Sequence, residues 1–165
     1  MDHKNKLNAR FTFALLLLLC FVPANAGKPR RFMGHKEFLP YTRNLPAIDK
    51  VELLKLTLKD DHRNGEHWNG EIDATKVLRG IEAQKVASLW RNQTYTPNIS
   101  ACDEPAHAIK FYSHGKLLVY ASVCFACENI FFITPKSTRG QTFAAGNKKG
   151  EQLSEVFRLA FAEAR

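Results

Sequence analysis

The sequence predicts an α+β domain: an antiparallel sheet of about five strands with two amphipathic helices packed on it. Two observations predict this class. Apolar residues alternate along several short segments bounded by turn signals, and in two other segments the apolar period changes to that of a helix. The order is strand, strand, helix, three or four strands, helix. Consecutive strands joined by short turns favour antiparallel pairing, and two helices can cover one face of such a sheet.

Five segments carry the strand pattern, and they are residues 51–58, 72–78, 107–112, 117–124 and 130–134. Residues 59–70 are polar and contain two Asn-Gly turn signals, so they predict the connection between the first two strands. Residues 113–116 predict a tight hairpin turn. We expect loops at 94–105 and 135–140, and a short strand at best at 141–145.

Two segments have apolar residues at helical spacing. The first is predicted to run from Ile81 to near Arg91, and the second closes the chain. The apolar stripe of the first helix consists of Ala83, Val86, Ala87 and Trp90, and that of the second of Leu153, Val156, Phe157, Ala160 and Ala164.

The first 26 residues have the three parts of a secretory signal peptide. A basic start is followed by the apolar stretch Phe11–Val22, and Ala24–Ala26 provides small residues before a cut at Gly27. A transmembrane anchor needs about 20 apolar residues, more than this stretch offers. We therefore expect export to the periplasm or the extracellular space. Residues 27–47 predict an extended N-terminal arm, and residues 48–165 a single domain.

Removal of 26 from 165 residues leaves 139, and takes three of the 24 basic and one of the 16 acidic residues, so the net charge falls from +8 to +6. A basic surface favours acidic partners. No nucleic-acid module is present, so we expect no nucleic acid as partner. We expect a monomer without a transmembrane span after cleavage, and an unknown envelope protein or ligand as partner.

Cleavage also removes Cys20 and leaves three cysteines, which are Cys102, Cys124 and Cys127. If Tyr112 lies opposite Leu117 in the predicted hairpin, Cys102 projects opposite Cys127 and His107 lies opposite Ser122. In this register His107 shares a face with Cys124. A bulge would slip the register by one residue and change which side chains share a face.

Three interpretations of the cysteines stay open. The first is a structural disulfide from Cys102 to Cys124 or Cys127; a Cys102–Cys127 bridge would contribute about 3.5 kcal/mol in the chain-entropy model. The second is zinc bound by the three thiolates, with His107 as the fourth ligand and Asp103 or Glu104 as substitutes. The third is thiol-redox chemistry at the C-x-x-C motif, although a strand in place of a helix start removes the usual electrostatic support.

The segment from Cys102 to Tyr112, followed by Gly115–Leu118 and Cys124–Ile130, resembles a family of small uncharacterised bacterial exported proteins. The resemblance covers about residues 78–134, including Leu89–Arg91 of the predicted helix. It implies that the three cysteines act as one site and that the source is bacterial. It implies no activity and supplies no catalytic residue.

No catalytic motif is found, since the chain has no phosphate-binding Gly-rich loop, H-E-x-x-H motif or Ser-His-Asp order. We expect a non-enzymatic binding or structural protein of the cell envelope with a structural cysteine cluster. A zinc-binding or thiol-redox envelope protein is the alternative, with zinc as its cofactor.

Overall fold

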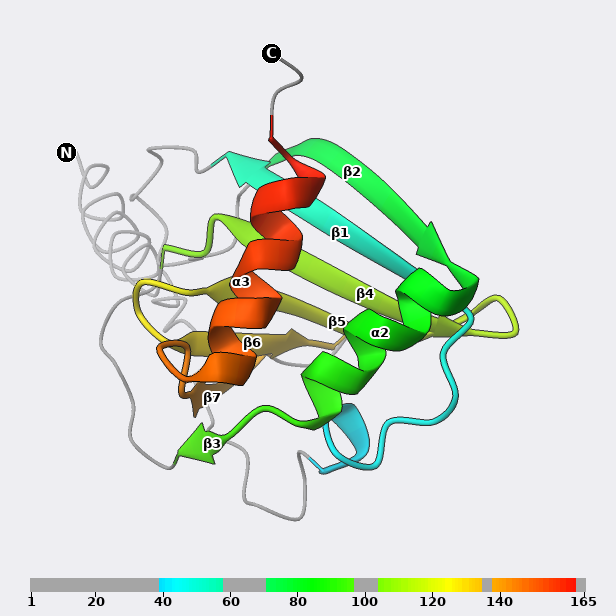
Figure 1. The fold of residues 1–165 in the computed structure, drawn as a ribbon, viewed down its shortest axis with the longest axis horizontal. Coiled ribbons are helices and arrows are strands. Elements are labelled where there is room, and N and C mark those ends of the chain that lie inside the picture. The colour runs from blue at the N-terminus through cyan, green and yellow to red at the C-terminus, as the bar shows by residue number, and fades with distance from the viewer. Residues whose placement is uncertain (1–38, 58–70, 97–103, 135–137, 163–165) are drawn as a thin grey trace, which may run out of the picture.

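The computed structural model describes residues 39–57, 71–96, 104–134 and 138–162, and everything below concerns these residues (Figure 1). They form a seven-stranded antiparallel sheet in the order β2-β1-β4-β5-β6-β7-β3. The strands are β1 (Lys50–Thr57), β2 (Glu71–Arg79), β3 (Tyr95–Thr96), β4 (His107–Ser113), β5 (Lys116–Cys124), β6 (Asn129–Ile133) and β7 (Thr138–Phe143). The helices are the 3-10 turn η1 (Leu39–Tyr41), α2 (Gly80–Arg91) and α3 (Lys148–Ala160). The predicted signal peptide, residues 1–26, lies outside the described residues.

The α+β class is confirmed, but the expected strand number of about five is wrong. The two additional strands are β3 and β7, which lie in segments predicted as loop or as a short strand at best. Both are rich in polar residues and pair with each other, Tyr95 opposite Phe143. Such segments are held in the sheet by backbone hydrogen bonds to a neighbouring strand, which any residue type can form. They therefore need no alternation of apolar residues, and the sequence pattern does not reveal them.

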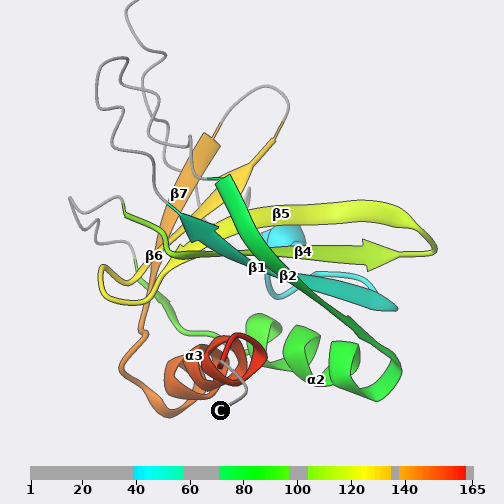
Figure 2. The same cartoon turned by 90° about the horizontal axis from the view of Figure 1, so that it is seen from above.

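Both α-helices pack on the same face of the sheet (Figure 2). In α2 the buried side chains are those of the predicted stripe, and in α3 Leu153 and Phe157 are fully buried. The largest side chains of this core are Trp90, Phe111, Phe132, Phe143 and Phe157. These side chains and the apolar stripes of both helices are removed from water together. Burial of this apolar surface is the main stabilising contribution to the core between the sheet and the helices.

The segment before β1 is held against α2 by side chains of that helix. Trp90 Nε1 donates to the carbonyl oxygen of Tyr41 at 2.8 Å, and Arg91 Nε donates to that of Leu45 at 2.9 Å. Leu45 and Ile48 belong to the core between sheet and helices. The chain therefore enters β1 from the helix side of the sheet.

The β4–β5 hairpin begins in the predicted register and then slips. Tyr112 lies opposite Leu117, and the two turn residues, His114 and Gly115, have φ of 49° and 75°. Positive φ at both positions matches the twist of the flanking strands. A bulge between Phe111 and Tyr112 then shifts the pairing by one residue. Because of this shift, each residue of β4 before the bulge faces a β5 residue one position later than predicted, which changes the side chains that share its face of the sheet.

Candidate functional site

The two cysteines of the C-x-x-C motif lie in the tight connection between β5 and β6. Cys124 is the last residue of β5, and the backbone N–H of Cys127 donates to its Sγ at 3.3 Å. Glu128 closes the turn with a left-handed φ of 55°, and its N–H donates to the carbonyl oxygen of Phe125 at 3.4 Å. The predicted strand–turn–strand context of the motif is confirmed, so neither cysteine stands at the start of an α-helix.

The two sulfur atoms differ in state. Cys124 is the free cysteine of the described residues, and only 4% of it is exposed. Cys127 is disulfide-bonded. Cys102, the third cysteine of the predicted cluster, lies outside the described residues. Burial shields this free thiol from attack, because reactive cysteines are partly exposed to solvent.

His107 occupies a different face from the one that we expected. The bulge places it opposite Val123, not Ser122. Its ring packs among those of three phenylalanines on the helix side, with centroid distances of 5.9 Å to Phe125, 5.0 Å to Phe157 and 6.3 Å to Phe161. Cross-strand partners share a face and successive residues alternate, so His107 and Cys124 point to opposite sides of the sheet.

Burial lowers the pKa of the His107 imidazole, and the positive charge of Lys55 lowers it further. Lys55 lies directly opposite His107 on β1. Both effects favour the neutral form of the ring. This environment is typical of a histidine that packs at the border of a core.

No group of three or more His, Cys, Asp or Glu side chains that could hold a metal ion occurs among the described residues. Of the predicted zinc ligands, Cys124 and Cys127 lie in one turn, and His107 is directed away from Cys124. Cys102 and the alternative ligand Asp103 lie outside the described residues. The complete four-ligand set therefore stays a prediction.

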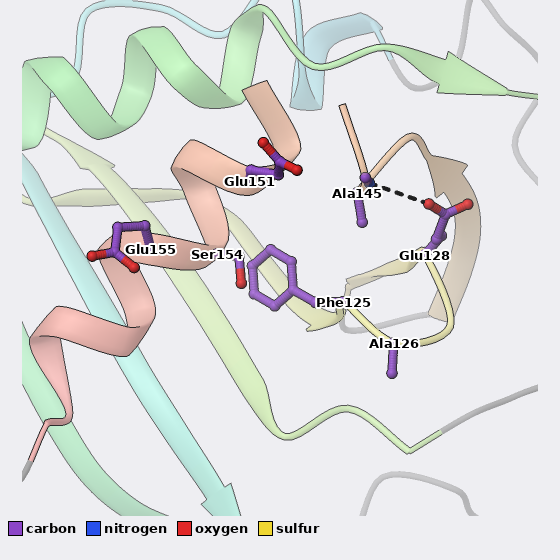
Figure 3. A pocket seen from close by; sticks show the side chains of 8 residues that line it. Phe125, Ala126, Glu128, Ala145, Glu151, Ser154 and Glu155 are labelled. Carbon is purple, nitrogen blue, oxygen red and sulfur yellow. Dashed lines mark hydrogen bonds between the residues drawn. The ribbon is translucent and has the colours of Figure 1, made fainter. Parts of the chain in front are cut away.

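A pocket of about 470 Å³ lies beside the turn, between it and the first turns of α3. In Figure 3 the ring of Phe125 reaches from the turn toward Ser154 of α3. The pocket is acidic, and its lining residues are Phe125, Ala126, Glu128, Ala145, Gly146, Glu151, Ser154 and Glu155. Glu155 is paired with Arg158 at 2.5 Å, and Glu128 accepts the N–H of Gly146 at 3.4 Å.

Sequence reasoning did not identify this acidic lining. The i, i+4 spacing of Glu151 and Glu155 places both carboxylates on one side of α3, and this spacing was a usable signal. That these two residues line one pocket with Glu128 depends on how α3 docks on the sheet. No local pattern encodes that docking.

Comparison of the chain with protein-family models, with curated proteins and with solved structures found no match. None of the helices in the described ranges is both long enough and apolar enough to cross a membrane. What the protein does must therefore be inferred from its own residues.

Proposed function

We propose that this protein is an exported, non-enzymatic domain of the cell envelope that binds a partner or ligand, and that a Cys102–Cys127 disulfide stabilises it. The observation that carries the proposal is the unequal state of the two neighbouring cysteines. Cys127 is disulfide-bonded, whereas Cys124 keeps a free, buried thiol. If the signal peptide takes Cys20 away, Cys102 is the partner that the mature chain offers to Cys127.

The proposed bridge has a stabilising role that suits a small exported domain. It would enclose the whole β4–β5 hairpin and would contribute about 3.5 kcal/mol by restricting the unfolded chain. Disulfides persist in the oxidising compartments to which a signal peptide directs a protein. The net stability of a domain is about 5–15 kcal/mol, so a covalent restraint of this size would be a large part of it.

The surroundings of Cys124 favour a structural role over a redox role. A catalytic thiol needs exposure and is commonly placed at a helix N-terminus. Cys124 is buried and lies at the end of a strand. The zinc alternative would require Cys127 as a thiolate, and a disulfide removes that ligand.

The state of the cysteines can be tested on the mature chain by native mass spectrometry with and without a chelator, followed by alkylation and peptide mapping. We expect one Cys102–Cys127 bridge, one thiol at Cys124 that reacts after unfolding, and no bound metal. The matched variants are Cys124→Ser, which should keep the bridge, and Cys102→Ser, which should lose it. Bound zinc with three free thiols would establish the alternative. A Cys124 thiol that reacts rapidly in the native protein would favour redox chemistry.

Export is tested separately, by expressing the full chain in a bacterium with a periplasm and determining the N-terminus of the product. We expect a periplasmic protein that begins at Gly27. An uncleaved chain in the cytoplasm would overturn the export part of the proposal. It would also count against the disulfide, because the cytoplasm keeps thiols reduced.

A further inference from the structure

We draw no further inference here: the strongest candidate, the acidic pocket lined by Glu128, Glu151 and Glu155 between the β5–β6 turn and the first turns of α3, is a cluster of carboxylates at the start of a helix, and nothing else in the described part of the chain indicates which ligand it would take.

Discussion

His107 lies directly opposite Val123 on the neighbouring strand. This pairing, set by the bulge between Phe111 and Tyr112, directs the imidazole into the phenylalanine cluster under α3, which includes Phe125 of the turn, and onto the face of the sheet opposite Cys124. A register without the bulge would have placed the same ring beside Cys124. One extra residue in β5 therefore decides whether this histidine is available to the cysteines.

The stability of the protein should fall on acidification because of His107. Burial and then Lys55 lower the pKa of its imidazole in the folded state. The unfolded chain has the ordinary value of about 6.5, so it binds more protons than the native state below that pH. The contribution of neutral His107 is thus complete above about pH 6.5 and is lost as the pH falls toward the lowered folded pKa.

The measurement is the free energy of unfolding in urea at a series of pH values from about 7.5 to 5. His107→Phe should flatten the slope in this range, since an uncharged ring takes the same place. An unchanged slope in His107→Phe would show that other groups cause the acid sensitivity.

The N–H of Cys127 should depend on the sulfur of Cys124 for its hydrogen bond. Cys124→Val removes the acceptor at similar size and leaves a buried donor, so we expect a loss of about 1 kcal/mol in unfolding free energy. Cys124→Ser keeps an acceptor oxygen. Hydrogen exchange of the Cys127 amide should accelerate in the valine variant and much less in the serine variant. Equal protection in both would mean that another group accepts this N–H.

Gly150 in the first turn of α3 should not tolerate a side chain. A Cβ at this position would meet the backbone carbonyl oxygens of Ala144 and Ala145, which cannot move without displacing the chain before the helix. The N–H of Gly150 is also fixed at 2.9 Å from Oδ1 of the helix cap, Asn147. We expect Gly150→Ala to lower the unfolding free energy by about 2–3 kcal/mol.

Gly146, four residues earlier, provides the control for this prediction. A Cβ there has nothing within 4 Å, so Gly146→Ala should change stability by no more than about 0.5 kcal/mol. Thermal melts of the two variants make the comparison. Similar melting temperatures would indicate that the chain before α3 adapts to the added methyl group.

Among the residues that the structure describes, the hydroxyl of Ser122 has no hydrogen-bond partner, although the residue is fully buried. Ser122→Ala removes an unpaired polar group, so we expect unchanged stability or a gain of up to about 1 kcal/mol. The reverse change at its cross-strand neighbour, Ala108→Ser, should lower the unfolding free energy by about 1–3 kcal/mol, because it buries a second hydroxyl directly opposite Ser122. Urea unfolding of both variants checks the pair. A destabilised Ser122→Ala would reveal a partner for the hydroxyl.

Local pattern was sufficient for most of the elements. The stripe from Ala83 to Trp90 predicted α2, and short apolar segments bounded by turn signals predicted β1, β2, β4, β5 and β6 near their observed bounds. In α2 the buried side chains recur at helical spacing, so the burial period is written in the residue types themselves. The strand–turn–strand setting of Cys124 and Cys127 followed from the same patterns.

The sequence by itself determined the α+β class, the order of the main elements and the position of the cysteine turn between two strands. Only the tertiary structure decided that His107 faces the helices, that Thr138–Phe143 forms a full strand, and that Glu128, Glu151 and Glu155 line one pocket. The physical reason is the range of the interactions. Side-chain periodicity is a local property, whereas a bulge, an edge-strand pairing and a helix docking position each depend on partners far away in the chain.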